Sequence, residues 1–109
     1  DDPFLAIGSP GGSRIITAVL QIILNVIDFE QSLEEATDSK RVHHQWYPDD
    51  IDIEETYNQI NELMDLGYKI DIIDTATCTQ SIKIDDGEFI GVSDLRRPDS
   101  LALGVKNDW

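Results

Sequence analysis

Two adjacent glycines, Gly11 and Gly12, are the residues whose type and position point most directly to chemistry. They follow the segment Gly8-Ser9-Pro10 and precede a long apolar stretch. Glycine lets a ligand atom approach the main chain without meeting a Cβ, and the first N–H groups of a helix are unpaired at the positive end of its dipole. The turn could therefore hold an anion or a developing oxyanion. A sharp turn that only packs a strand against a helix explains the same glycines, and spacing alone favours that explanation.

The adjacent histidines His43 and His44 invite a metal-site interpretation. Consecutive side chains point to different sides, however, and no third ligand stands at a useful spacing. Hydrogen bonding and packing are the favoured roles for both rings. We expect neither a metal nor a cofactor.

Asp94 lies close to Arg96 and Arg97, and these three residues could form a functional cluster. A loop held by ion pairs accounts for the same pattern and is the favoured interpretation.

The element that must position the glycine turn is the helix-forming stretch that begins with it, residues 11–27. Its polar members recur at steps of three and four: Arg14, Thr17, Gln21, Asn25 and then Asp28. This spacing draws one narrow polar stripe along a helix that is otherwise apolar, so we expect the helix to be buried on most sides. At about 24 Å it is too short to span a bilayer.

Shorter elements surround this helix. Strands are predicted at residues 4–7, 51–54, 68–73, 79–84 and 89–92, with an Asp86-Gly87 hairpin turn before the last. Capping boxes at Ser32/Glu35 and Thr56/Gln59 predict two helices, the second ending at Gly67 with Tyr57 and Met64 in the core. Residues 40–48 read as an ordered loop, and residues from Ser100 onward as a tail. The order indicates an α+β fold, with helices packed on a largely antiparallel sheet.

Length and charge limit the possible functions. The 109 residues are at most one domain, and the acidic segments around the central helix offer little to cover it, so the chain is expected to be an incomplete part of something larger. Eight basic residues against 22 acidic ones give a net charge of −14, which argues against nucleic acid and anionic membranes as partners. The single cysteine, Cys78, permits no internal disulfide.

Three segments resemble γ-glutamyltranspeptidase, in that family's order and at about its spacing. They are Gly8-Ser9-Pro10-Gly11-Gly12-Ser13-Arg14-Ile15, His43-His44-Gln45-Trp46 with Pro48-Asp49, and Ser93-Asp94 with Arg96-Arg97-Pro98-Asp99. Two residues depart from the pattern: Lys40 and Leu95 stand where the family usually has proline.

The resemblance implies that residues 1–109 are the C-terminal segment of the small subunit, a single incomplete domain within the αββα sandwich of the N-terminal nucleophile hydrolases. In that family a threonine forms an acyl-enzyme with γ-glutamyl compounds such as glutathione, and water, an amino acid or a peptide accepts the acyl group. Gly11 and Gly12 match its oxyanion-hole glycines, which reverses the preference stated from spacing.

The resemblance also implies partners and a location. The expected partners are the remainder of the small subunit and the large subunit of the same precursor, and a chain on its own could self-associate. The threonine and other substrate-binding residues are expected upstream, so the isolated chain is predicted to be inactive. A periplasmic or secreted location is carried over from the family.

Two alternatives remain open. A cephalosporin acylase or a capsule-anchoring transpeptidase could share this region. A free-standing acidic interaction domain could use the glycine turn to bind phosphate or carboxylate; exposure of the apolar face of residues 15–27 would argue against it.

Overall fold

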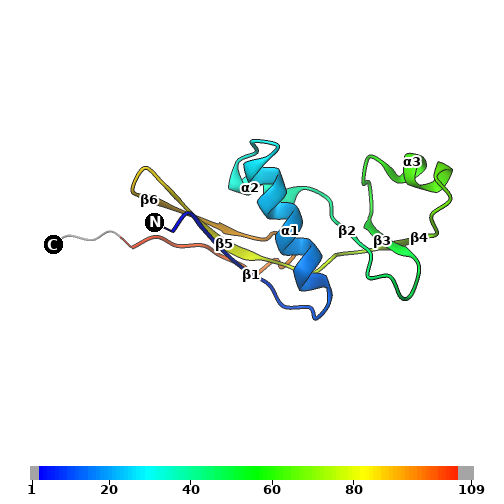
Figure 1. Ribbon diagram of the computed structural model, residues 1–109. Helices are drawn as coiled ribbons and strands as arrows, with labels where there is room; N and C mark the ends of the chain where they lie inside the picture. The colour runs from blue at the N-terminus through cyan, green and yellow to red at the C-terminus, as the bar shows by residue number, and fades with distance from the viewer. Residues whose placement is uncertain (1–2, 106–109) are drawn as a thin grey trace.

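The computed structural model describes residues 3–105 and contains two three-stranded sheets with one long helix between them (Figure 1). The first sheet has the order β1-β5-β6 and is antiparallel throughout. The second has the order β2-β3-β4, with β2 and β3 antiparallel and β3 and β4 parallel. The strands are β1 (Leu5–Gly8), β2 (Val42–His43), β3 (Ile51–Glu54), β4 (Ile70–Ile73), β5 (Gln80–Asp85) and β6 (Glu88–Ser93). The helices are α1 (Arg14–Ile27), α2 (Leu33–Asp38) and α3 (Ile60–Asp65).

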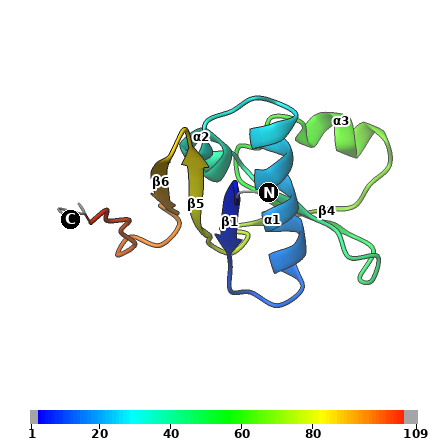
Figure 2. The ribbon, with the colours of Figure 1, turned by 60° about the vertical axis from the view of Figure 1, so that its left-hand side comes forward.

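The main core lies where α1 and α2 cover the first sheet. Ile22 and Val26 of α1 pack with Leu33 and Ala36 of α2, and Leu5, Ile7 and Val92 of the sheet close the cluster. Figure 2 shows β6, β5 and β1 side by side, with α1 next to β1. The predicted α+β class with largely antiparallel strands is therefore confirmed: three of the four described strand pairs are antiparallel, and the second sheet also contains a parallel pair.

Local signals in the sequence predicted several elements correctly. Ser32 caps α2 by accepting a 3.1 Å hydrogen bond from the N–H of Glu35. The β5–β6 hairpin turns at Asp86 and Gly87, which both have positive φ. Gly67, with φ of 92°, follows α3 and donates its N–H to the carbonyl of Met64.

The prediction that α1 is buried on most sides is wrong for the described part of the chain. Ile16, Leu20, Leu24 and Ile27 are 73%, 50%, 38% and 56% exposed. The polar stripe is also partly covered, because its side chains bond to the second sheet: Gln21 Nε2 donates to the carbonyl of Val42 at 2.8 Å. The helix therefore buries Ala18, Ile22 and Val26 in the core, turns its polar stripe toward the second sheet and exposes a separate apolar stripe.

The predicted capping box at Thr56 does not form. Thr56 adopts a φ of 64° in a turn closed by the N–H of Tyr57 on the carbonyl of Glu54, so α3 begins only at Ile60. No residue of α3 is fully buried, and Met64 is 56% exposed, so Met64 and Tyr57 do not belong to the core of the described residues. Both were predicted as core because their spacing is helical, and spacing does not show whether a face is covered.

Two smaller differences concern loops and ends. The predicted loop at residues 40–48 contains the short strand β2. The predicted tail has no regular secondary structure from Ser100 to Val105, and its remainder, residues 106–109, lies outside the described part. None of the helices in the described range is long and apolar enough to cross a membrane.

Candidate functional site

The turn between β1 and α1 contains both predicted site residues. Gly11 has a φ of 118° and Gly12 a φ of 61°, conformations that L side chains rarely adopt. Their carbonyls accept the N–H groups of Arg14, at 3.3 Å, and Ile15, at 3.1 Å. Within residues 3–105, the N–H groups of the two glycines donate to no other residue. The turn thus uses its acceptors to start the helix and leaves two donors free at its positive end.

Thr77 packs against this turn from the segment that leads into β5. Its hydroxyl bonds to the carbonyl of Pro10 and lies 3.0 Å from Ser9 Oγ. A Cβ added to Gly11 would lie 2.7 Å from Thr77 Oγ1, closer than non-bonded atoms approach. Glycine is therefore required at position 11 by both conformation and contact.

A cleft of about 380 Å³ opens beside Gly11. It is lined by Pro10, Gly11, Arg14, Thr75, Thr77, Cys78, Arg96 and Arg97. The guanidinium of Arg14 pairs with Asp52 at 2.8 Å and remains partly exposed. Arg14 and Arg96 are paired with carboxylates, so within the described lining the charge of Arg97 is the one left for a negatively charged or carbonyl-bearing ligand.

Next to the cleft lies a buried network of two arginines and two carboxylates. Arg96 forms a two-pronged pair with Glu54, Nε to Oε2 at 2.6 Å and Nη2 to Oε1 at 2.5 Å. Arg41 pairs with Asp94 at 2.8 Å, and Arg96 also reaches Asp94 at 3.1 Å. Arg41, Glu54 and Asp94 are all at most 1% exposed. The network joins the end of β3, the entry to β2 and the segment after β6.

The network also controls the charge states of its members. Burial by itself would raise the pKa of Glu54, but hydrogen bonds from Arg96 and from the N–H groups of Ala76 and Arg41 outweigh it and lower that pKa. The pKa of Asp94 is lowered in the same way: burial opposes ionisation, whereas the Arg96 N–H, the Arg41 charge and the Thr79 N–H favour it. Both carboxylates are therefore held ionised.

Sequence reasoning found only part of this network. The ion-pair interpretation is confirmed for Asp94 and Arg96, whereas the structure gives the side chain of Arg97 no bonded partner among the described residues. Arg41 and Glu54 were missed. The available signal was a charged residue at the end of an apolar strand, Glu54 after Ile51-Asp52-Ile53, which indicates a buried partner.

The two histidines make separate hydrogen bonds, as the sequence interpretation favoured. His43 is buried between Thr17 and Gln45, at 2.7 and 2.8 Å. His44 points instead to Asp49, at 3.1 Å, and its Nδ1 accepts the N–H of Trp46.

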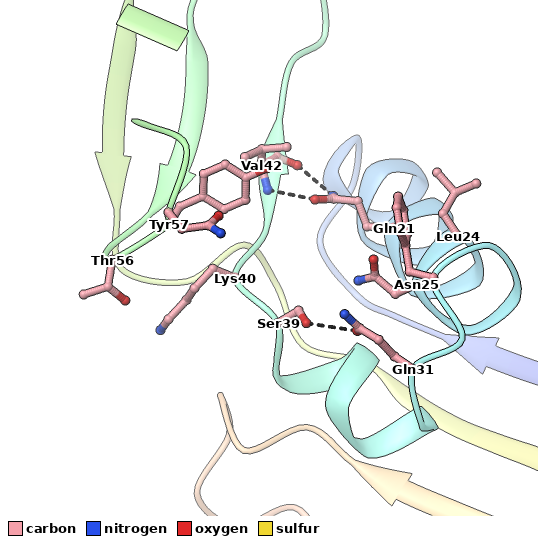
Figure 3. Close-up of a pocket in the computed structure, with 11 residues that line it drawn as sticks. Gln21, Leu24, Asn25, Gln31, Ser39, Lys40, Val42, Thr56 and Tyr57 are labelled. Carbon is pink, nitrogen blue, oxygen red and sulfur yellow. Dashed lines mark hydrogen bonds between the residues drawn. The ribbon is translucent and has the colours of Figure 1, made fainter. Parts of the chain in front are cut away.

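A second pocket, of about 480 Å³, lies toward the other end of α1 (Figure 3). Gln21 crosses it and pairs with both backbone groups of Val42, as a neighbouring strand would. Lys40 and Tyr57 are its titratable side chains. Its described lining has no carboxylate to act as a general base beside Lys40 or the hydroxyls, so the glycine turn remains the stronger candidate for chemistry.

The chain is similar in sequence and in structure to one group of known proteins. The family model described as gamma-glutamyltranspeptidase matches residues 1–104. The glutathione hydrolase proenzyme of Escherichia coli is 43% identical over 104 residues, which are 93% of this chain and 18% of that protein. The solved gamma-glutamyltranspeptidase of Pseudomonas nitroreducens, complexed with L-DON, is 34% identical with a TM-score of 0.86 and covers 94% of this chain and 56% of its own.

A more distant structure shares the fold. The transpeptidase enzyme CapD of Bacillus anthracis is 22% identical with a TM-score of 0.74, over 92% of this chain and 63% of its own. The chain thus spans about half the length of the solved transpeptidase chain from Pseudomonas and under a fifth of the Escherichia coli proenzyme.

Proposed function

Since the chain belongs to the γ-glutamyltranspeptidase family, we propose that residues 1–109 are the C-terminal segment of the small subunit of a glutathione hydrolase. The whole protein would transfer γ-glutamyl groups from glutathione and related compounds to water, amino acids or peptides. The 43% identity to a glutathione hydrolase, against 24% to a cephalosporin acylase and 22% to CapD, supports this activity over that of a related acylase or capsule transpeptidase.

In this proposal the chain supplies the oxyanion hole. A threonine from outside residues 1–109 adds its hydroxyl oxygen to the γ-carbonyl carbon and passes its proton to its own α-amine. The carbonyl oxygen becomes an oxyanion, which accepts hydrogen bonds from the N–H groups of Gly11 and Gly12. When the intermediate collapses, the C–N bond breaks and the leaving amine takes the proton. Water or an amine then repeats the addition on the acyl-enzyme.

One observation carries the assignment: both glycine amides lack a partner in residues 3–105, at the N-terminus of a 14-residue helix. The cleft beside Gly11 gives a carbonyl group access to the turn. Electrostatic stabilisation at such a place acts on charge that develops only in the transition state.

The decisive experiment removes the donors from the whole protein. Replacing Gly11 or Gly12 by glycolic acid exchanges the N–H for an ester oxygen and keeps the shape. We expect kcat for a chromogenic γ-glutamyl anilide to fall by about 100- to 1000-fold. The same exchange at Gly104, where an added Cβ would meet no described atom within 4 Å, is the control and should leave the rate unchanged. Unaltered rates at both positions of the turn would refute the assignment.

We further propose that the exposed stripe of α1 is where the rest of the same precursor packs. The stripe consists of Ile16, Leu20, Leu24 and Ile27. The relatives are proenzymes several times longer than this chain, so ample polypeptide exists to cover it. A free-standing domain would not be expected to leave such an apolar stripe of its longest helix uncovered, which weakens that alternative.

A further inference from the structure

The side chain of His43 links the second sheet to the first turns of α1. It is 4% exposed, and its Nδ1 lies 2.7 Å from Thr17 Oγ1 on the helix. Its Nε2 lies 2.8 Å from Gln45 Oε1. The same Gln45 oxygen accepts the hydroxyl of Ser13 at 2.8 Å. Two points of α1, Thr17 and Ser13, are thus tied to one short segment of chain.

The direction of these bonds follows from the chemistry of the groups. An amide oxygen has no proton to donate, so Nε2 of His43 must carry one. In the neutral ring Nδ1 is then an acceptor, and Thr17 donates its one hydroxyl proton to it at 2.7 Å in place of the Arg14 carbonyl, which lies farther away at 3.3 Å. The NH₂ group of Gln45 donates in turn to the carbonyl of Tyr47 at 3.0 Å, which holds the amide in that orientation.

Ser13 is the residue at which this network meets the proposed oxyanion hole. It follows Gly12 directly and stands at the N-cap position of α1, yet its side chain does not cap the helix. Its hydroxyl is donated to Gln45 instead. Two glycines in a row leave the main chain loose, so a bond to the next residue restricts the positions that their N–H groups can take.

We propose that His43 and Gln45 are positioning residues, which hold Ser13 and thereby aim the N–H groups of Gly11 and Gly12 at the reacting oxygen. The inference rests on the proposed function of the turn. Neither residue needs to touch the substrate. A misplacement of about 1 Å at a reacting group costs about 100-fold in rate, so a small shift of the turn is measurable.

The test uses the whole processed protein and a chromogenic γ-glutamyl anilide. Gln45→Met removes the acceptor oxygen and keeps the length of the side chain; we expect kcat to fall by about 10- to 100-fold, with KM changed less than about twofold. Gln45→Glu keeps an acceptor for Ser13 but loses the donor to the carbonyl of Tyr47, so it should recover part of the lost kcat. His43→Asn and Ser13→Ala should each lower kcat in the same manner.

Matched controls separate positioning from stability. His44→Asn changes the neighbouring ring, which bonds to Asp49 and not toward Ser13. Ser32→Ala removes the other N-cap serine, which does cap its helix. We expect Ser32→Ala to lower the melting temperature without lowering kcat. Ser13→Ala should lower kcat without lowering the melting temperature. Equal losses of kcat in Gln45→Met and Gln45→Glu, or a loss confined to KM, would overturn the proposal.

A second measurement does not depend on the reaction. Hydrogen exchange of the backbone amides of residues 11–13 should be faster in Gln45→Met than in the unaltered protein and intermediate in Gln45→Glu. Faster exchange in a protein that does not hydrolyse γ-glutamyl anilides would refute the proposed function and leave the positioning intact. Unchanged exchange together with unchanged kcat would refute the positioning alone.

Discussion

Gly11 and Thr77 are separated by 66 positions in the chain, yet a Cβ on Gly11 would lie 2.7 Å from the hydroxyl oxygen of Thr77. Gly12, its neighbour, has no described atom within 4 Å of the corresponding position. The two glycines therefore have different requirements: Gly11 needs space and a positive φ, whereas Gly12 needs only the positive φ.

This difference predicts unequal effects of alanine at the two positions. Gly12→Ala should cost about 1–2 kcal/mol of stability, the penalty of a left-handed backbone. Gly11→Ala should cost more and also lower kcat, because the turn must move away from Thr77. Urea denaturation of the whole protein measures the loss of stability, and steady-state kinetics measure the loss of kcat.

A double-mutant cycle isolates the contact. Thr77→Gly removes the obstructing side chain, and Gly11→Ala should then be less harmful in Thr77→Gly than in the unaltered protein. If the effects of Gly11→Ala and Thr77→Gly on stability and kcat simply add, the contact between Gly11 and Thr77 does not cause the loss.

The pair between Arg96 and Glu54 predicts a large stability effect. Arg96→Met leaves a carboxylate uncompensated in the interior and should cost about 3–5 kcal/mol. Arg96→Lys should also be destabilising, since an ammonium cannot reproduce the two-pronged bond. Arg97→Lys, at the exposed neighbouring position, is the control and should change the unfolding midpoint little. Urea titrations measure the free energy of unfolding of each variant. Equal unfolding midpoints for Arg96→Met, Arg96→Lys and Arg97→Lys would contradict the prediction.

The lowered pKa values of Glu54 and Asp94 predict acid sensitivity. A carboxyl whose pKa is lower in the folded state contributes stability above its unfolded pKa and loses that contribution as the pH falls through the folded value. Loss should therefore begin below about pH 4, the ordinary range of carboxyl groups, and continue to lower pH. Unfolding free energy measured from pH 6 to 2 should fall less steeply in Glu54→Gln than in the unaltered protein. If the two curves of unfolding free energy against pH are parallel, Glu54 does not contribute to the acid sensitivity.

The exposed stripe of α1 predicts how the separate chain behaves. Leu20→Gln with Leu24→Gln should reduce self-association of residues 1–109, measured by sedimentation, because burial of each leucine in an association contributes about 1.5–3 kcal/mol. Leu66→Gln, at an exposed site after α3, is the comparison and should have a smaller effect. In the whole protein the same double change should instead destabilise the fold. An unchanged association state would argue against this stripe as the contact surface.

The separate chain is also predicted to be catalytically inactive. It would hold the glycine donors without the attacking threonine, so purified residues 1–109 should transfer no γ-glutamyl group to glycylglycine. Detection of the transfer product by mass spectrometry above a no-protein blank would contradict the prediction.

Much of the local structure could be predicted because its causes lie within a few residues. The Ser32 cap, the Asp86-Gly87 hairpin and the Gly67 helix end each depend on hydrogen bonds or backbone preferences across at most four positions. The Gly11-Gly12 turn belongs to the same class, since its glycines and the start of the helix are adjacent in the chain.

Most of the failures come from contacts between distant segments, whereas the Thr56 box fails because a local turn replaces it. The sequence predicted the polar stripe of α1 but not what it faces, because Thr17 and Gln21 meet partners more than 20 positions away on β2. Glu54 and Arg96, 42 positions apart, come together only when β3 and the segment after β6 are both in place.

Sequence alone determined the cap of α2, the β5–β6 hairpin, the end of α3 and the place of the glycine turn, since these follow from local bonding. Only the tertiary structure decided which face of α1 is covered, that Thr77 closes on Gly11, and that His43 and Gln45 hold Ser13. Those contacts depend on packing between distant segments, and no pattern of nearby residues encodes them.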